Sequence, residues 1–493
     1  MLKDFRKRKR GGKEDVSSEL KIFKEALLAR QQRLRDAGLP VLVLIEGWAA
    51  AGKGSLIKEL ISEIDPRFYN VVSPVIVAQA EERSPFLKQY VSAIPENGKI
   101  AFYDSGWMES AVRKFLKREI TKDEYHNLRR QSVEFERQLR DGGYLVLKIF
   151  LHIDKSEQFE RLRNLSENPA TEWRVTREDV WQHKEYKRFF TAYDEYMEST
   201  GDWQILDGSR RKAAARDALK LIIEKIDDGL TRGRYIGKPF EEKFPLIKMP
   251  HLSDVDLSLA VSEEEYKAEL KELQTRLSEL HNIIYRRKIP VILCYEGWDA
   301  AGKGGNIRRA AYPLDPRGFD VQPIASPTLN EKNRHFLWRF WTKLPRTGHI
   351  CIFDRTWYGR VMVERLEGFC SEDDYKRAYN EINEFERALT EWGAVVLKFW
   401  IHIDKDTQLA RFTDRQNTPE KQWKITDEDW RNREKWDLYE PAIDEMLQKT
   451  STKNAPWYII ESNDKKYARL KTLRIIVDAL EKACDNQFKQ MTN

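Results

Sequence analysis

The strongest constraint on this chain is that its second half repeats its first. EGWAAAGKGS begins at Glu46 and EGWDAAGKGG begins at Glu296. EFER at 134–137 and HIDK at 152–155 recur at 384–387 and 402–405, and each motif is displaced by 250 residues. Solenoid repeats have periods of about 20–50 residues, so this longer and constant period indicates a duplicated domain. We therefore expect two copies of one fold.

The segments between and before the copies have a different composition. Residues 1–16 begin MLKDFRKRKRGGK, a basic tail that we expect to be solvated, although it could contact an anion. Copy one spans 17–229, and copy two spans 256–493. Residues 230–255 are rich in Gly and Pro and lack periodicity, which predicts a linker.

Short apolar runs alternate with amphipathic helices in each copy. In copy two we expect helices over Ser262–Arg287 and Asp373–Glu391, and strands over Pro290–Tyr295, His349–Phe353 and Ala394–Ile403. This alternation is typical of a parallel sheet that helices cover on both faces. The fold class is therefore α/β, with two tandem three-layer α/β/α domains.

Composition excludes several classes of protein. The 86 basic residues are nearly balanced by 80 acidic ones, and a net charge of +6 does not indicate a nucleic-acid binder. No apolar run approaches the ~18 residues that a membrane helix needs, and the N-terminus is not a secretory signal. The four cysteines form no CxxC pair, so we expect core residues in a cytoplasmic protein.

A glycine-rich loop carries the clearest chemical signal. Gly297 to Lys303 fits GxxxxGK, the Walker A pattern, directly after a predicted strand and before a helix. Backbone N–H groups, the helix N-terminus and the Lys303 ammonium together favour polyphosphate anions. Gly304 and then Gly305 follow where a Ser or Thr usually binds Mg²⁺. A metal would then need carboxylates, and Asp299 and Asp354 are the candidates, although Asp354 alone could be a helix N-cap.

At this point the chain resembles a known family. GWDAAGKGG at 297–305, FLWRFW at 336–341, FDRTWYGRVMVER at 353–365 and APWYII at 455–460 look like the polyphosphate kinase 2 family, in its two-domain form. The resemblance covers nearly the whole chain beyond the tail. It implies a P-loop kinase fold with a helical lid, and transfer of a terminal phosphate from inorganic polyphosphate to AMP, giving ADP. It also implies Mg²⁺ as cofactor, with Mn²⁺ as a substitute.

Comparing the copies indicates which one is catalytic. Lys303 and Asp354 have counterparts in Lys53 and Asp104, but Asp299 is matched by Ala49. Arginines of copy two are matched by uncharged residues: Arg355 by Ser105, Arg360 by Ser110, Arg365 by Phe115 and Arg415 by Leu165. Phosphoryl transfer depends on neutralising phosphate charge. We therefore expect copy one to be structural or regulatory; the alternative is a specialised second site.

Two further groups of cations complete the predicted site. In 333–349, a basic track for polyphosphate is predicted; the alternative is a helix with solvated charges. Beyond it, the segment from Arg411 to Asp437 is the predicted lid, which closes over phosphates and excludes water. Glu364 and Arg365 are expected to face the same cleft, and His335 and His402 are not expected to form a phosphoenzyme. The track consists of Arg334, Arg339, Lys343 and Arg346, and the lid cations are Arg411 and Arg415.

Three functions fit these residues. The first is polyphosphate-dependent phosphorylation of AMP, with catalytic residues Asp299, Lys303, Asp354 and Arg355. The second is a related kinase that uses ADP or GDP as acceptor, or ATP as donor. The third is a non-catalytic polyphosphate-binding scaffold. The sequence leaves base specificity, direction and oligomeric state open, and a homo-oligomer is compatible with it.

Overall fold

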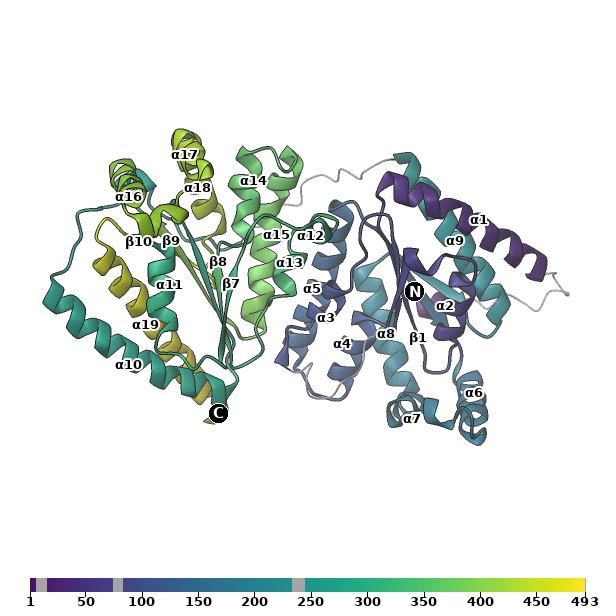
Figure 1. Ribbon diagram of the computed structural model, residues 1–493. Helices are drawn as coiled ribbons and strands as arrows, with labels where there is room; N and C mark the ends of the chain where they lie inside the picture. The colour runs from purple at the N-terminus through teal and green to yellow at the C-terminus, as the bar shows by residue number, and fades with distance from the viewer. Residues whose placement is uncertain (6–15, 74–82, 233–243, 493) are drawn as a thin grey trace. The chain divides into compact units, whose positions relative to one another are not determined.

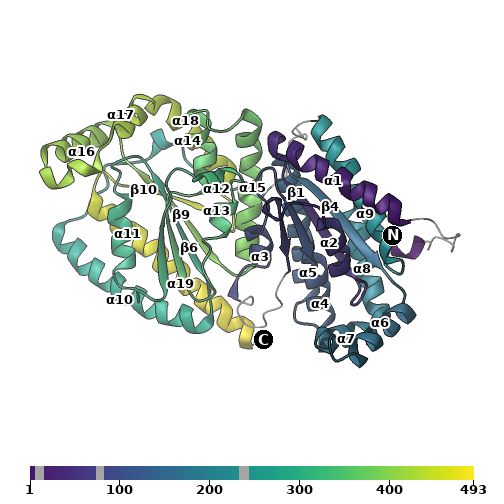
Figure 2. The same cartoon turned by 45° about the vertical axis from the view of Figure 1, so that its right-hand side comes forward.

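The computed structural model describes residues 1–5, 16–73, 83–232 and 244–492. They form two compact units. Unit 1 holds the described residues up to 232 except 83–85, together with Thr328–Trp338, and unit 2 holds the rest. Each unit is a parallel sheet between helices (Figures 1 and 2). The α/β class with two tandem domains is therefore confirmed.

Unit 2 contains a five-stranded parallel sheet in the order β10-β9-β6-β8-β7. Its strands are almost fully buried at the centre, because β6 and β8 are continuous apolar runs that helices cover on both faces. The strand bounds are β6 Val291–Gly297, β7 Phe319–Pro323, β8 Ile350–Asp354, β9 Val395–His402 and β10 Trp457–Glu461.

Helices cover both faces of this sheet. One face carries α10 (Glu263–Arg287), α11 (Lys303–Ala311) and α19 (Lys465–Thr492), and the other carries α15 (Glu372–Glu391) and α18 (Trp436–Thr450) (Figure 1). Capping boxes begin α10 at Ser262 and α15 at Ser371, so both helices start within two residues of the predicted positions. The lid elements α16 (Lys405–Asn417), η7 (Pro419–Lys424) and α17 (Asp427–Glu434) follow β9 directly.

Unit 1 repeats this architecture, with the sheet order β2-β3-β1-β4-β5. The strands are β1 Val41–Gly47, β2 Tyr69–Val72, β3 Ile100–Asp104, β4 Leu145–His152 and β5 Trp203–Asp207. Helices α1 (Val16–Ala37), α2 (Lys53–Ile61) and α9 (Arg211–Arg232) cover one face; α4 (Trp107–Leu116), α5 (Lys122–Asp141) and α8 (Tyr186–Thr200) cover the other (Figure 1). Its lid elements are α6 (Lys155–Glu167), η4 (Glu172–Arg174) and α7 (Arg177–Lys184).

Buried polar pairs recur at equivalent places in the two cores. Lys398 and Glu386 form an ion pair at 2.7 Å, and Lys148 and Glu136 form its counterpart at 2.8 Å. The four cysteines form no disulfide; Cys294 and Cys351 are buried in strands, as predicted. The described residues contain no helix long and apolar enough to cross a membrane.

The predicted tail and linker both have structured parts. In the tail, Leu2 and Lys3 bind the buried Asp194 of α8, through a backbone hydrogen bond and an ion pair at 2.9 Å. In the linker, Leu246 bridges to Thr452, and Met249 and Leu252 are buried in unit 2. Residues 6–15 and 233–243 lie outside the described residues.

Candidate active site

The glycine-rich loop joins β6 to α11 and is shaped by left-handed backbone angles. Gly297 has φ 152°, and a Cβ there would lie 2.4 Å from the carbonyl oxygen of Ile401, so only glycine fits. Ala300 and Gly302 also have positive φ, at 60° and 111°. The loop ends at the N-terminus of α11, where unpaired backbone N–H groups favour an anion.

Lys303, the first residue of α11, points back over the loop. Its Nζ donates to the carbonyl oxygens of Gly297 at 2.6 Å and of Trp298 at 3.3 Å. A Cβ on Gly304 would meet no atom within 4 Å. The structure therefore leaves room at this position for the Ser or Thr that usually binds Mg²⁺. A Cβ on Gly305 would lie 3.4 Å from a guanidinium nitrogen of Arg469, so this glycine allows Arg469 to approach α11.

Asp354 ends β8, and its register partner in β6 is Tyr295, four residues before Asp299. Arg355 follows with φ 65°, a strained angle for a residue other than glycine. Its guanidinium lies 3.7 Å from the Asp299 carboxylate. Partial burial lowers the pKa of Arg355, but the carboxylates of Asp299, Glu296, Glu428 and Asp354 outweigh it and raise that pKa. Four predicted or neighbouring site residues are therefore close to one cation.

Two residues of this cluster were missed by the sequence analysis. Asn432 of α17 donates from Nδ2 to Oδ2 of Asp299 at 2.9 Å, which links the lid to the loop. Glu296 is buried and accepts from the backbone N–H and the hydroxyl of Thr356, each at 2.7 Å. Burial raises the pKa of Glu296. Two sequence signals were available: the contrast between Asn432 and its counterpart Gln182, and the recurrence of Glu296 as Glu46 in the repeated motif.

Arg411 has partners that differ from those expected of a lid arginine. Its guanidinium donates to four backbone carbonyls, those of Ala300, Ala301, Ser462 and Asn463. Burial and the neighbouring Arg415 lower the pKa of Arg411 to about 10. In copy one, Arg161 binds the carbonyls of Ala50, Ala51, Gly208 and Ser209 in the same way. The geometry gives this arginine a structural role that both loops share.

A cationic pocket of about 200 Å³ lies beside the loop in unit 2. Burial and the charges of Arg411 and Arg469 lower the pKa of Lys465, because like charges are crowded there. Asp414 is the carboxylate in the lining, and it pairs with Lys421 at 2.9 Å. Such a concentration of cations favours a polyanion. The lining residues are Ala300, Gly302, Gly305, Asn306, Arg411, Asp414, Arg415, Lys421, Ser462, Lys465 and Arg469.

The residues after Asp354 are paired with each other or with neighbouring helices. Arg360 and Glu364 form an ion pair at 3.1 Å. Arg365 binds Glu445 at 2.6 Å and stacks over Tyr375 at 4.6 Å. Arg360 and Glu364 therefore lie together, whereas Arg365 ties α14 (Val363–Leu366) to α15 and α18.

The predicted polyphosphate track is not gathered in the cationic pocket. Arg334 belongs to unit 1, where it binds Glu96 and the carbonyl of Ile94, each at 3.1 Å. Arg339 is buried and donates to the carbonyl of Ala325 at 2.8 Å. Lys343 is half-buried and Arg346 is exposed. The segment forms only a short helix, α13 (Trp338–Trp341), because Pro345 and Gly348 interrupt it.

Comparison with known proteins agrees with this architecture. The model of the family "Polyphosphate kinase 2" matches residues 10–232 and again residues 260–488. The chain belongs to the polyphosphate kinase 2 family. The predicted family membership is therefore confirmed, and each of the two copies matches the family model separately.

Known proteins match this chain either over nearly its whole length or over less than half of it. A protein of Pseudomonas aeruginosa named polyphosphate:AMP phosphotransferase is 38% identical, over 94% of this chain and 95% of its own length. An ADP-polyphosphate phosphotransferase of the same organism is 36% identical, over 45% of this chain and 72% of its own length. A crystal structure described as a polyphosphate kinase 2 from Pseudomonas aeruginosa has a TM-score of 0.82 and 35% identity, with 96% of each chain covered.

Proposed function

We propose that this chain is a polyphosphate:AMP phosphotransferase whose active site lies in copy two. The observation that carries the proposal is the cationic pocket, which shares Ala300 and Gly302 with the phosphate loop and Gly305 with the first turn of α11. The pocket for a polyanionic donor thus lies next to the loop at which phosphate would be transferred. AMP as acceptor is supported by the relative that matches over the full duplicated length, since its name specifies AMP.

The donor would lie in the cationic pocket with its end at the phosphate loop. Arg415, Lys421, Lys465 and Arg469 supply charges along a path that begins at Gly302 and Gly305. Aligning β5 with β10 and the two lids gives Leu165, Thr171, Arg211 and Ala215 as their counterparts, so copy one has one cation of the four. The equivalent region of copy one therefore carries fewer cations than the pocket of the copy that has Asp299.

Asp299 and Asp354 fit a Mg²⁺ ion that phosphates help to hold. Among the described residues, no cluster of three or more His, Cys, Asp or Glu side chains could hold a metal alone. Mg²⁺ is commonly bound by one or two carboxylates, with water and substrate phosphates completing its shell. Asp299 and Asp354 both lie near Arg355, so they match that type of site. When bound, Mg²⁺ (or Mn²⁺) neutralises charge on the transferring phosphate.

The side chains of copy two suggest direct transfer. An oxygen of the AMP phosphate attacks the terminal phosphorus of polyphosphate in line, and the bond from that phosphorus to the bridging oxygen of the chain breaks. Lys303 and Arg355 neutralise the transferring group, and the shortened polyphosphate leaves as the anion. His402 is unsuited to carry the phosphate, because it is buried and its Nδ1 accepts from Trp298 Nε1 at 3.1 Å.

A second acceptor follows from the relatives that match one copy. The ADP-polyphosphate phosphotransferase covers less than half of this chain, and its name specifies ADP. ADP is therefore the alternative acceptor to test. Nucleotide acceptors are cytoplasmic metabolites, which supports the cytoplasm as the place of action.

The test is to incubate the purified chain with Mg²⁺, AMP and long-chain polyphosphate, without ATP, and to measure ADP. Asp299→Ala and Asp354→Ala should abolish the product. Asp104→Ala, the copy-one counterpart of Asp354→Ala, should leave it, and this variant is the matched control. Formation of ATP from ADP but none of ADP from AMP would move the function to the second acceptor. Product formed only from ATP would contradict the polyphosphate donor.

A further inference from the structure

The phosphate loop of copy one has the same backbone shape as the catalytic loop. Gly47, Ala50 and Gly52 have φ values of 153°, 60° and 100°, close to those of Gly297, Ala300 and Gly302. Lys53 begins α2, as Lys303 begins α11. Its Nζ lies 3.4 Å from the carbonyl of Gly47. The main chain of copy one is therefore built to hold a phosphate.

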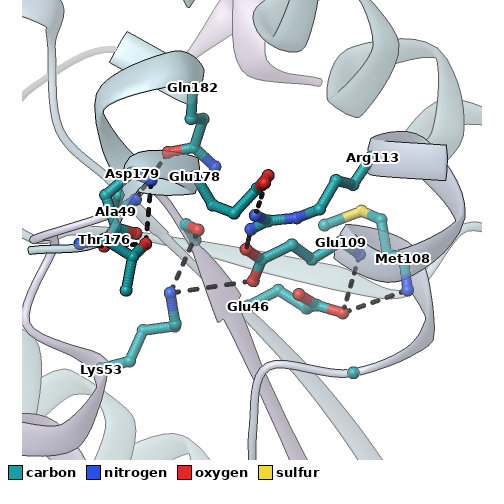
Figure 3. Close-up of polar contacts among 12 residues, drawn as sticks. Glu46, Ala49, Lys53, Met108, Glu109, Arg113, Thr176, Glu178, Asp179 and Gln182 are labelled. Carbon is teal, nitrogen blue, oxygen red and sulfur yellow. Dashed lines mark hydrogen bonds and ion pairs between the residues drawn. The ribbon is translucent and has the colours of Figure 1, made fainter. Parts of the chain in front are cut away.

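A carboxylate already occupies the neighbourhood of that lysine. Glu109 projects from α4, and its Oε2 lies 3.9 Å from Nζ of Lys53 (Figure 3). Its other oxygen binds the guanidinium of Arg113, one helical turn further along. The side chains of Lys53 and Glu109 are 14% and 13% exposed, so water screens the pair only weakly. Glu109 is thus bound as an anion between two cations.

Its neighbours keep Glu109 ionised. Burial favours the neutral acid, but Lys53 and Arg113 outweigh it and hold the pKa of Glu109 below its ordinary value. The nearby Glu46 is fully buried and close to Glu109, and these two effects raise the pKa of Glu46 to about 8. The opposite directions of these two shifts assign the negative charge of the pair to Glu109.

The lid of copy one closes the rest of the site. Gln182 of α7 accepts a hydrogen bond from the backbone N–H of Ala49, in the loop, at 2.7 Å (Figure 3). Glu178, one turn earlier in α7, binds Arg113 at 3.0 Å. A loop N–H and both cations around Glu109 thus have partners within unit 1.

Copy two lacks the carboxylate and the guanidinium at the centre of this arrangement. Glu109 and Arg113 are matched by Gly359 and Val363. The segment after Asp104 is a continuous α-helix, which places Glu109 and Arg113 on one face. The matching segment after Asp354 is instead a 3₁₀-helix, η6 (Trp357–Val361), followed by the short α14. A Cβ on Gly359 would meet no atom within 4 Å, so a larger side chain has room there.

We propose that Glu109 is an internal anion that takes the place of a substrate phosphate in copy one. Copy one then has a phosphate-binding site that cannot bind phosphate or polyphosphate while the Glu109 carboxylate occupies it. The wild-type chain binds a single end of polyphosphate, at copy two. The proposal concerns binding and not turnover, so it stands or falls separately from the proposed function.

Tripolyphosphate, a short inorganic polyphosphate, is the probe for this site. Isothermal titration calorimetry should give one equivalent per wild-type chain and two per Glu109→Gln chain, because the amide keeps the shape and removes the charge. Adding Lys53→Ala to Glu109→Gln should abolish the second equivalent. Glu160→Gln removes an exposed carboxylate of copy one, paired with Arg163, and should bind one equivalent. A folded Glu109→Gln chain that gains no equivalent overturns the proposal.

A reciprocal change in copy two provides a test that does not depend on the folding of the Glu109 variant. Gly359→Glu introduces a carboxylate at the position that matches Glu109, and Gly359→Gln introduces an amide of the same size. We expect tripolyphosphate to bind Gly359→Glu at least tenfold more weakly than Gly359→Gln. Equal affinity of the two variants would overturn the proposal. If wild type binds no tripolyphosphate, a single equivalent gained by Glu109→Gln still supports it, while the donor assigned under the proposed function fails.

Discussion

The amide of Asn432 and the carboxylate of Asp299 are 2.9 Å apart, and they connect lid helix α17 to the phosphate loop. The equivalent position of copy one, Gln182, binds a backbone N–H of the loop because the carboxylate there is replaced by Ala49. The same lid position thus orients a carboxylate in one copy and caps the loop in the other.

Asn432→Ala should therefore impair turnover more than stability. A hydrogen bond to a charged group contributes about 1.5–3 kcal/mol, so kcat should fall about 10- to 100-fold if this bond orients Asp299 during transfer. Steady-state ADP formation measures the effect. Gln182→Ala is the matched control and should change kcat less than about threefold, since the proposed active site lies in copy two. Equal losses of kcat in the two variants would show that the bond to Asp299 has no special role.

Replacing the two loop lysines tests the asymmetry between the copies directly. Lys303→Ala should lower kcat about 10³-fold or more, since one well-placed cation can have an effect of this size on phosphoryl transfer. Lys53→Ala should leave kcat largely intact. It should nevertheless lower the melting temperature, because Glu109 loses a partner in a weakly solvated place. A large loss of kcat in Lys53→Ala, with an unchanged circular dichroism spectrum, would make copy one catalytic.

Much of this fold could be predicted from the sequence, because the relevant signals are local. Apolar runs, helical periodicity and the loop pattern predicted strands β6, β8 and β9 of copy two, the start of α10 and the position of Lys303, but not the edge strands β7 and β10. Asn432 and Glu109 could not be assigned in this way. Asn432 reaches Asp299 from 133 residues away. Glu109 approaches Lys53 to 3.9 Å from α4, an element that is distant from the loop in sequence and is brought beside it by packing.

The sequence predicted that cations would bind the phosphates, but it could not predict which cations line the pocket, because their positions depend on tertiary contacts. Arg411 was predicted to contact phosphate, yet its donors bind four carbonyls that the loop and the end of β10 bring together. Lys465 and Arg469 were not singled out, because α19 is an amphipathic helix whose cations look solvated in sequence. Only the packing of α19 beside the loop places them in the pocket.

Arg469→Ala introduces the residue that copy one has at this place, Ala215, and tests the donor pocket. We expect the KM for polyphosphate to rise about tenfold, while the KM for AMP and the kcat at saturating donor stay nearly constant. The increase should shrink as ionic strength rises, because salt screens exposed charges. Arg317→Ala removes an exposed cation paired with Asp315 and is the control. A rise in the KM for AMP alone would assign the pocket to the acceptor.

The lowered pKa of the buried His402 predicts how the stability of the fold changes with pH. Burial lowers the pKa of this imidazole from 6.5 to about 4, and its Nδ1 must stay unprotonated to accept from Trp298. The folded chain therefore binds the proton less readily than the unfolded chain. Its contribution is complete above pH 6.5 and is lost as the pH falls toward 4, by up to about 3 kcal/mol at 1.36 kcal/mol per pKa unit.

His402→Gln should remove part of this dependence, because glutamine retains an acceptor for Trp298 and does not titrate. Urea unfolding at pH 7.5 and pH 5 measures it. The unfolding midpoint of the wild type should fall further than that of His402→Gln over this interval. The two proteins should differ little in slope above pH 7, where the imidazole is neutral in both the folded and the unfolded chain. Identical midpoint shifts between pH 7.5 and pH 5 would mean that His402 is protonated in the fold, which would require Trp298 to lose its acceptor.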